Sequence, residues 1–462
     1  MEANNLNSVF QKNKQLFYFL GSLLAAFIIT ALVREPSYTQ AQTYVLFLLV
    51  FSVGLWLTEA VPPFAVGLFI IAYLVFTLGY ELFTSTPMDV KIYVNTFSSS
   101  VIWLMMGGFF LASAMTKTKL DADLITITMK VCGTKPKSIL FGLMMVTMVF
   151  SMLISNTATT AMVIAALMPL LLKLGKGSHT GKALILGIPI AATTGGMGTL
   201  IGSPPNAIGA GALMNAGYQM DFVTWMYYGV PVTIFLTLLA WWVLVKLFMK
   251  KDEMISLSDV VAEKSEISKE FRMKRLIVVI ILSVTLILWL TSPVHNIPAA
   301  AVSVVPLVFL TLTGILRGED VRAIGWDTLI LVAGGLALGT GLQQTGLLEL
   351  YAGKIATLNV PHVVFFFLLA YATMLFSNIM SNTATATVLI PLGMAILPQF
   401  SIEVSMIIGL SASTALFLPV STPPNAIAYS TGLIEQKDLR IGGTLVGLLG
   451  PAIIVLWVML IS

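Results

Sequence analysis

Residues 150–159 read FSMLISNTAT and residues 376–385 read FSNIMSNTAT, and the two stretches agree at seven of ten positions. A second pair follows each of them in the same order: residues 203–208 read SPPNAI and residues 422–427 read TPPNAI, which agree at five of six. A motif order that occurs twice predicts an architecture that occurs twice. We therefore expect the chain to consist of two structural repeats.

The composition around these motifs is that of a membrane protein. Of the 462 residues, 57% are hydrophobic and only 10% are charged, against about 25% charged residues in soluble domains. Several apolar runs, among them 16–33 and 225–247, approach or exceed the roughly 20 residues that cross a bilayer as a helix. We expect an all-α polytopic membrane protein with about 11 transmembrane helices and two re-entrant hairpins.

The distribution of positive charge predicts the orientation. With the N-terminus in the cytoplasm, 22 of the 25 Lys and Arg residues fall on the inner side, and only Arg34, Lys91 and Lys354 fall outside. Positive charge in short loops favours the cytoplasmic side. We therefore expect a multi-pass protein of a bacterial inner membrane, with a cytoplasmic N-terminus and an external C-terminus.

The same topology predicts the domain boundaries. Residues 1–40 form a tail and first helix, 41–247 the first repeat, 248–275 a cytoplasmic linker, and 276–462 the second repeat. The first repeat begins with an inward crossing and the second with an outward one, so the repeats are inverted, as in many transporters. The linker carries mixed charge, which favours a solvated connector over the alternative of an amphipathic helix on anionic lipid.

Each repeat divides further, into scaffold helices followed by a hairpin and a broken helix. The scaffold helices are 41–120 and 276–350, and the hairpins with their broken helices are 135–247 and 360–462. Ser-Asn-Thr within hydrocarbon predicts a hairpin tip, because non-helical backbone at membrane depth must be buried in protein or line a cavity. The Pro-Pro-Asn segments must interrupt their helices, because proline lacks the amide donor.

The serines of the motifs predict sodium sites. Ser151 and Ser155 are four residues apart and share one helical face, and neutral oxygens suit a hard monovalent cation. With the Asn156 side chain and the carbonyls around Gly202 they are expected to hold one sodium ion. The expected twin consists of Ser377, Ser381, Asn382 and the region of Ser421. Serines that bond back to their own helix are the alternative, which the duplication disfavours.

The same breaks in the helices predict an anion site. Helix N-termini offer unpaired N–H groups and partial positive charge. Further hydroxyl and amide donors are expected from Thr157, Thr383, Ser203, Thr422, Asn156 and Asn382. Neither motif pair contains lysine or arginine, so bound sodium must balance a dianion, and each ligand then favours the other.

Other functions have weaker support in the sequence. Glu59 is the one acidic residue expected inside a span, and His179, His295 and His362 fall in predicted loops, so a proton relay is disfavoured. The sequence contains no metal-ligand set, nucleotide loop or nucleophile with a base, so an enzyme is not expected. An anion exchanger on the same fold stays open, whereas a channel is disfavoured.

These motifs resemble the divalent anion/sodium symporter family, which carries C4-dicarboxylates, citrate and sulfate with sodium. The resemblance covers nearly the entire chain and includes residues 416–425, LFLPVSTPPN. It implies a homodimer with a static scaffold and a mobile, elevator-like transport domain. It implies sodium at Ser151, Ser155, Asn156 and Gly202 and at Ser377, Ser381, Asn382 and Ser421, and it adds Pro423 to the substrate residues.

The expected function is therefore sodium-coupled symport of C4-dicarboxylates such as succinate, malate or fumarate. An exchanger, or a sulfate or citrate carrier, is the alternative. Sodium ions, at least two, are the coupling ions, with no further cofactor. The expected partners are the small anion, sodium, membrane lipid and a second copy of the chain, and no nucleic acid.

Overall fold

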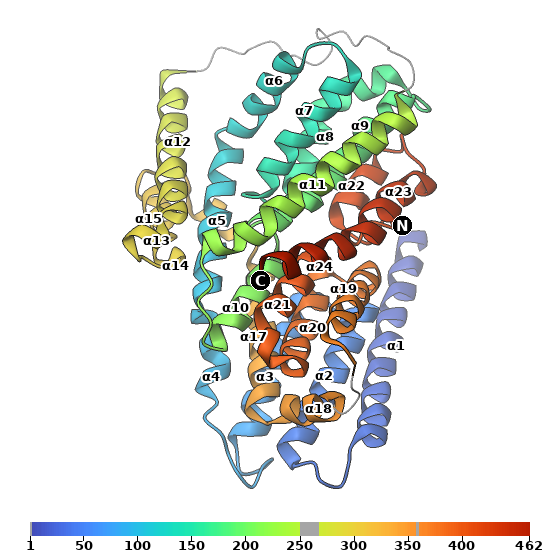
Figure 1. The fold of residues 1–462 in the computed structure, drawn as a ribbon, viewed down its shortest axis with the longest axis vertical. Helices are drawn as coiled ribbons and strands as arrows, with labels where there is room; N and C mark the ends of the chain where they lie inside the picture. Colours follow the sequence, from blue (N-terminus) through green and yellow to red (C-terminus); the bar gives the residue numbers. More distant parts are fainter. Residues whose placement is uncertain (1, 250–267, 357–359) are drawn as a thin grey trace.

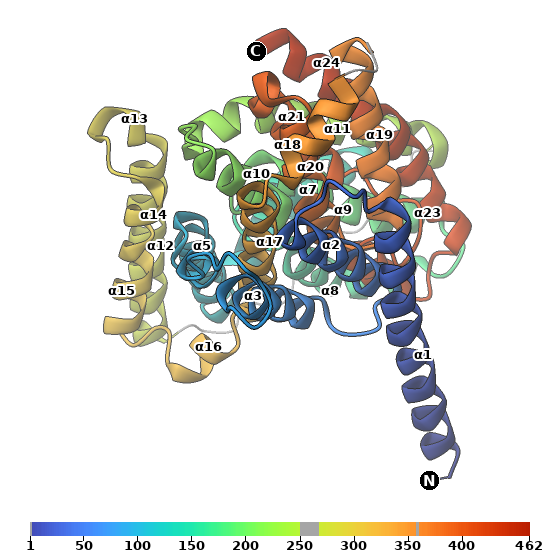
Figure 2. The ribbon, with the colours of Figure 1, turned by 90° about the horizontal axis from the view of Figure 1, so that it is seen from below.

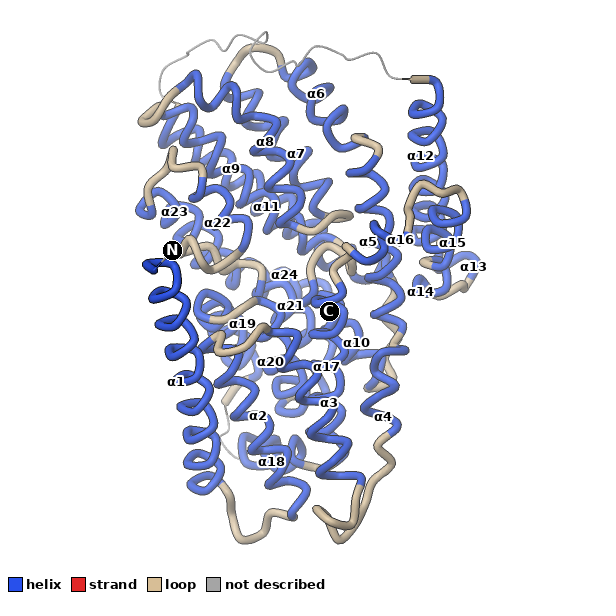
Figure 3. Tube along the Cα trace, turned by 180° about the vertical axis from the view of Figure 1, so that it is seen from behind, coloured by secondary structure: helices blue, strands red, loops and turns tan. Residues whose placement is uncertain are grey.

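The computed structural model describes residues 2–249, 268–356 and 360–462. Within these ranges the regular elements are all helical (Figure 3). Most of the predicted linker, 248–275, lies outside the described residues, and the chain is described again from Ser268, which caps the helix that follows.

The first half of the chain, up to Phe248, contains eleven α-helices. They are α1 (Glu2–Val33), α2 (Gln40–Thr58), α3 (Pro63–Gly79), α4 (Lys91–Val94), α5 (Ser100–Lys117), α6 (Leu120–Cys132), α7 (Pro136–Ser151), α8 (Asn156–Leu174), α9 (His179–Gly195), α10 (Pro204–Asn215) and α11 (Phe222–Phe248). Side chains at the helix N-termini start several of them, since Thr39, Ser178 and Asp221 accept hydrogen bonds from the first turns of α2, α9 and α11.

The second half follows a similar order of elements. It comprises α12 (Lys269–Leu290), α13 (Ser292–His295), α14 (Ala299–Val302), α15 (Val304–Leu312), α16 (Gly318–Arg322), α17 (Trp326–Gln344), α18 (Leu347–Ala356), α19 (His362–Ile379), α20 (Asn382–Ile396), α21 (Ser401–Ala412), α22 (Pro423–Ser430), α23 (Gln436–Gly442), a π-helical turn (Gly443–Leu448) and α24 (Leu449–Ile461).

The prediction of an all-α polytopic membrane protein is confirmed. Eight helices in the described ranges are long and apolar enough to cross a membrane, and up to nine if α20 and α21, bent by 119° at their junction, count as one span. The sequence predicted about 11. The smaller number arises because α3, α7 and the α14–α15 pair are apolar but shorter.

The chain reverses direction at each repeated motif. α7 packs against α8, and α19 packs against α20, so each Ser-Asn-Thr lies at the tip of a helical hairpin. Figure 1 shows α7 and α8 toward one end of the long axis and α20 toward the other. The short helices that precede the hairpins, α6 and α18, likewise lie near opposite ends (Figure 1).

The halves interlock through close helix contacts. A Cβ atom on Gly334 of α17 would overlap the backbone of Gly67 in α3, and one on Gly107 of α5 would lie 2.6 Å from the Ser303 side chain between α14 and α15. Gly107 and Gly334 each belong to a Gly-Gly pair, 107–108 and 334–335, and the missing side chains let helices of one half pack closely on the other half. Figure 2 shows α12 to α15 along one side of the molecule and α1 on another.

Candidate functional site

The first hairpin tip brings Ser151 and Asn156 together. The Ser151 Oγ lies 2.5 Å from the Asn156 side chain, and Ser151 is fully buried. In the orientation that satisfies its surroundings, the Asn156 amide nitrogen also donates to the carbonyls of Ala192 at 3.1 Å and Gly202 at 3.3 Å. Ser155 instead caps α8, accepting from the Ala158 N–H at 3.2 Å, and is exposed. The structure therefore joins three of the four predicted sodium residues, and places the Ser155 side chain on the helix end.

The break between α9 and α10, residues 196–203, closes over this tip. The Thr199 hydroxyl donates to the Met152 carbonyl, and the Gly202 N–H donates to Thr199 Oγ1 at 3.1 Å. A Cβ on Gly202 would lie 2.6 Å from the Gly196 carbonyl oxygen, and one on Gly196 would lie 2.5 Å from the end of the Asn156 side chain. A side chain at Gly202 would therefore collide with the backbone of the loop itself, and one at Gly196 would displace Asn156 of the hairpin tip.

Asn206 of the Pro-Pro-Asn segment holds this loop in place. Its amide nitrogen donates to the carbonyls of Gly196 and Thr199, both at 2.7 Å. Because a broken helix leaves carbonyls without partners, a buried amide at this position replaces two bonds that the helix cannot make. Asn206 is therefore a structural residue of the loop.

The second hairpin tip has a different polar arrangement. Ser381 caps α20 by accepting from the Ala384 N–H at 3.1 Å, as Ser155 does in α8. Ser377 is fully buried, and within the described residues neither its Oγ nor the Oδ1 of Asn382 has a hydrogen-bond partner. Buried oxygens without partners are costly unless a ligand satisfies them, and oxygen is the donor that an alkali cation prefers.

The second loop, residues 413–422, is attached to its hairpin through Asn378. The Asn378 Oδ1 accepts from the Phe417 N–H at 3.0 Å and from the Ser421 hydroxyl at 2.8 Å. Ser421 Oγ accepts in turn from the Leu418 N–H at 3.1 Å. The predicted sodium residue Ser421 thus bonds to Asn378, which the sequence analysis did not single out.

Asn425 repeats the role of Asn206. Its amide nitrogen donates to the carbonyls of Leu416 at 3.1 Å and Leu418 at 3.0 Å. Asn378 and the two loop asparagines are therefore residues that sequence reasoning missed as individual participants. A signal for Asn378 existed, since it stands where the first motif has Met152 and is one of three positions at which the copies differ.

The predicted substrate residues lie at or beside the starts of four helices. Thr157 is exposed near the start of α8, Ser203 and Thr422 are buried just before α10 and α22, and Thr383 is half-buried in α20. Pro423, at the start of α22, is exposed. α22 packs against α8, and α10 packs against α20. Each broken helix therefore contacts the hairpin of the other repeat.

A cavity of about 450 Å³ lies elsewhere, between α10, α17, α18 and α20. Its walls include Leu336, Pro391 and Met394, with Gln343 and Glu349 among the polar groups. None of the predicted sodium or substrate residues lines it.

The titratable residues weighed at the sequence level are peripheral to the hairpin tips. Glu59 is exposed at the end of α2, with a left-handed backbone (φ 49°). His295 Nε2 lies 2.9 Å from the Leu288 carbonyl, and His362 stacks on Phe400. The described part of the chain contains no group of three or more His, Cys, Asp or Glu that could hold a metal ion.

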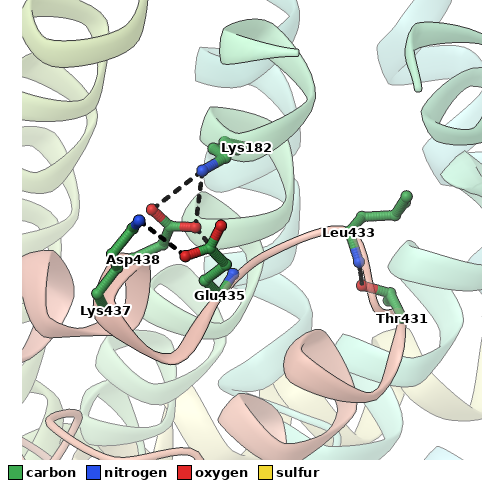
Figure 4. A network of polar contacts seen from close by, with 6 residues as sticks. All are labelled: Lys182, Thr431, Leu433, Glu435, Lys437 and Asp438. Carbon is green, nitrogen blue, oxygen red and sulfur yellow. Dashed lines mark hydrogen bonds and ion pairs between the residues drawn. The ribbon is translucent and has the colours of Figure 1, made fainter. Parts of the chain in front are cut away.

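A partly buried ion pair joins α9 of the first half of the chain to α23 of the second (Figure 4). Lys182 of α9 donates to both carboxylate oxygens of Asp438 in α23, at 2.9 and 3.2 Å. Asp438 also accepts from the Glu435 N–H at 2.9 Å, and Lys437 pairs with Glu435 at 2.8 Å. This network fixes the start of α23 against the first repeat.

Two hairpin tips closed by broken helices, in a polytopic helical protein, make the comparison with known families informative. A family model described as citrate transporter matches residues 53–407. The chain belongs to the citrate transporter family. This membership confirms the resemblance to sodium-coupled anion carriers. It also identifies the chain as a transporter rather than an enzyme.

Curated relatives of this citrate transporter family member cover almost its full length. The sodium-dependent dicarboxylate transporter SdcS of Staphylococcus saprophyticus is 30% identical over 95% of this chain and 89% of its own. The protein of the same name from Staphylococcus aureus strain USA300 is 28% identical over 97% and 91%.

Solved structures share the fold at low identity. The YdaH transporter of Alcanivorax borkumensis has a TM-score of 0.55 at 14% identity, covering 87% of this chain and 99% of that one. MtrF of Neisseria gonorrhoeae has a TM-score of 0.56 at 12% identity, covering 88% and 97%. The arrangement of helices is therefore one that membrane transporters use.

Proposed function

We propose that the chain is a sodium-coupled symporter of C4-dicarboxylates such as succinate, malate and fumarate. The observation that carries the proposal is the pair of hairpin tips, at which Ser151, Asn156 and Gly202 lie together in one repeat and the buried oxygens of Ser377 and Asn382 have no described partner in the other. The name of the staphylococcal relatives, which are about 30% identical, supports the choice of substrate and ion.

In this proposal the Asn156 side-chain amide turns so that its oxygen, in place of its nitrogen, faces the Ser151 hydroxyl and the loop carbonyl of Gly202. These oxygens then bind one sodium ion. Ser377, Asn382 and the loop carbonyls around Ser421 bind the second. Ser155 and Ser381, whose hydroxyls cap their helices, contribute by fixing the starts of α8 and α20. The assignment of a cation to each tip agrees with the excess of oxygens over donors there.

The substrate carboxylates are proposed to bind at the starts of α8, α10, α20 and α22, where N–H groups are free of intrahelical bonds. The donors are Asn156, Thr157, Ser203, Asn382, Thr383, Thr422 and the backbone at Pro423. Because neither motif pair contains a lysine or an arginine, bound sodium must offset the charge of the anion. Binding of each then favours the other, which is the thermodynamic requirement for symport.

We further propose a cytoplasmic N-terminus, a homodimer and an elevator motion of the hairpins and broken helices relative to α2, α3, α5, α12 and α17. The three basic residues predicted outside fit one end of the molecule. Lys354 pairs with Glu35 next to Arg34, and Lys91 starts α4, which lies toward the same end as α18 (Figure 1).

Uptake by protein reconstituted in vesicles tests the function. Labelled succinate should accumulate only under an inward sodium gradient, and should not when potassium replaces sodium. Equal uptake in potassium would reject sodium coupling, and uptake into sodium-free vesicles preloaded with succinate would show an exchanger. Because the family model is described as a citrate transporter, unlabelled citrate and sulfate should be included as competitors, and stronger competition by either would reassign the substrate.

A further inference from the structure

A groove of about 480 Å³ lies on the surface where α11 ends, against the segment 440–449. Its walls are mainly aliphatic and include Val243, Leu247, Leu445, Leu448 and Leu449. Leu247, Leu448 and Leu449 are each nearly half exposed. In a protein that crosses a bilayer, such a surface is one on which an acyl chain can lie.

One positive charge stands in this groove. Arg440 is exposed, and it makes no ion pair with another residue that the structure describes. The acidic residues nearest in sequence are already used, since Asp438 pairs with Lys182 and Glu435 with Lys437 (Figure 4). Lys246, near the end of α11, lies over the Trp242 ring at 3.8 Å. Among the described residues the groove therefore combines aliphatic walls with a guanidinium that has no acidic partner, which suits a phosphate group.

The segment that lines one side of the groove also packs against the second loop, residues 413–422. Thr444, Leu445 and Leu448 belong to the π-helical turn Gly443–Leu448. On its other side this turn holds Phe417, because a Cβ on Gly443 would lie 2.5 Å from Phe417 Cα and one on Gly447 would lie 2.5 Å from the Phe417 ring. π-Helical turns are rare and are frequent at functional sites.

Two hydrogen bonds continue this connection to the second hairpin. The Phe417 N–H donates to Asn378 Oδ1 at 3.0 Å, the atom that also accepts from Ser421. The Tyr371 hydroxyl of α19 donates to the Leu448 carbonyl at 2.8 Å. A shift of the π-helical turn would therefore be transmitted to the 413–422 loop and to the hairpin that carries Ser377.

We propose that this groove binds one anionic phospholipid, with its acyl chain along Val243, Leu445 and Leu448 and its phosphate on Arg440, and that the bound lipid holds the π-helical turn against Phe417 in the geometry that favours sodium at the second tip. The proposal of a lipid site depends only on the shape of the groove and the charge of Arg440. The effect on sodium rests on the proposed function.

Lipid retention by the purified full-length chain tests the site directly, by native mass spectrometry in detergent with added phosphatidylglycerol or phosphatidylcholine. The wild type should retain phosphatidylglycerol preferentially, and Arg440→Gln should lower that retention about fivefold, the effect of one basic residue near an anionic lipid. Arg440→Lys should keep most of it. Lys176→Gln, an exposed lysine in the α8–α9 connection, is the matched control and should behave as the wild type.

Retention of phosphatidylglycerol that is equal in the wild type and Arg440→Gln, or that falls equally in Lys176→Gln, would overturn the site. Leu445→Trp, which fills the groove but keeps the arginine, provides a second variant. It should lose the lipid as Arg440→Gln does, and unchanged retention would place the acyl chain elsewhere.

The effect on sodium is tested by thermal unfolding in vesicles of phosphatidylcholine alone or with one fifth phosphatidylglycerol. The half-saturating sodium concentration for stabilisation should be at least about fivefold lower with phosphatidylglycerol, the small end of allosteric couplings, and Arg440→Gln should remove the difference. A sodium dependence that is the same in both vesicles would reject the coupling while leaving the lipid site. Absence of any stabilisation by sodium would reject both the coupling and the proposed function, whereas lipid retention would still decide the site.

Discussion

The two hairpin tips share a sequence motif but are closed differently. In the first, Asn156 contacts Ser151 and the loop directly, and the neighbouring Met152 contributes only its carbonyl, to Thr199. In the second, the side chain of Asn378 joins hairpin and loop, and Asn382 Oδ1 has no described partner. The residues shared by the two motifs therefore specify a helical hairpin and its helix caps. The residues that differ decide which hydrogen bonds join each tip to its loop.

The loops differ in the same way. With the Pro-Pro-Asn segments aligned at 203 and 422, Gly202 corresponds to Ser421 and Gly196 to Ala415. In the first loop a side chain at Gly202 would meet the backbone of Gly196, and one at Gly196 would meet the Asn156 side chain. The second loop has room for side chains at both positions and uses Ser421 as a hydrogen-bonding group. If both tips bind sodium, we expect the first site to be more rigid and the second to be more sensitive to its surroundings.

Removing the shared asparagines should have the largest effect on transport. Asn156→Ala and Asn382→Ala should each lower sodium-driven succinate uptake about 100-fold, as expected when a hydrogen bond or ligand to a charged group is lost. Folding should be retained because both residues lie at hairpin tips. Glu59→Gln, at an exposed helix end, is the control and should change uptake less than about twofold. Normal uptake by both alanine variants would place the sites elsewhere.

Exchanging the loop residues between the repeats should strongly destabilise the protein in one direction only, when the first loop receives the serine of the second. Gly202→Ser places a Cβ 2.6 Å from the Gly196 carbonyl oxygen, which should destabilise the protein by about 1–3 kcal/mol and abolish most uptake. Ser421→Gly removes one hydroxyl that bonds to Asn378 and should cost about 1 kcal/mol. Thermal unfolding in detergent measures both. Equal effects of the two variants would contradict the tighter packing inferred for the first loop.

Giving the second hairpin the residue of the first should weaken its sodium site selectively. Asn378→Met leaves the Phe417 N–H and the Ser421 hydroxyl without their acceptor, at a cost of about 1–3 kcal/mol for each buried donor. The half-saturating sodium concentration of uptake should rise, with a smaller change in that of succinate. The reciprocal Met152→Asn is the companion variant, and a larger loss there would indicate that the first loop depends on this position more than the second does.

The smallest effect is expected at the other loop glycine. Gly196→Ala places a Cβ 2.5 Å from the amide of Asn156, the end of a side chain that can move aside. We expect a loss of uptake of about fivefold with little change in unfolding temperature, because overpacking against a mobile group costs about 1 kcal/mol. Ala415→Gly, the matched position of the second loop, should leave uptake unchanged. Unchanged uptake by Gly196→Ala would show that transport does not require Asn156 in its observed position.

Much of the site was predictable because repetition makes short motifs specific. The hairpins at Ser-Asn-Thr and the helix breaks at Pro-Pro-Asn follow from the exclusion of unpaired backbone from lipid and from the missing proline donor. The roles of Ser155 and Ser381 were not separable from those of Ser151 and Ser377 by spacing. The predicted common helical face does not form, because the backbone leaves the helix before Ser155 and Ser381, and their hydroxyls cap the next helix.

The sequence alone therefore determined the class of this protein, a helical membrane carrier with two duplicated helix breaks. The lengths of the apolar segments, the uneven distribution of basic residues and the order of the motifs can all be read from the sequence without the structure. Only the tertiary structure decided that Asn378, Thr199, Asn206 and Asn425 hold the loops, and that a π-helical turn packs on Phe417. The contacts of Asn378 and Thr199 join residues that are distant in sequence. Those of Asn206 and Asn425 depend on the path of the chain through each helix break, which the Pro-Pro-Asn motif alone does not specify.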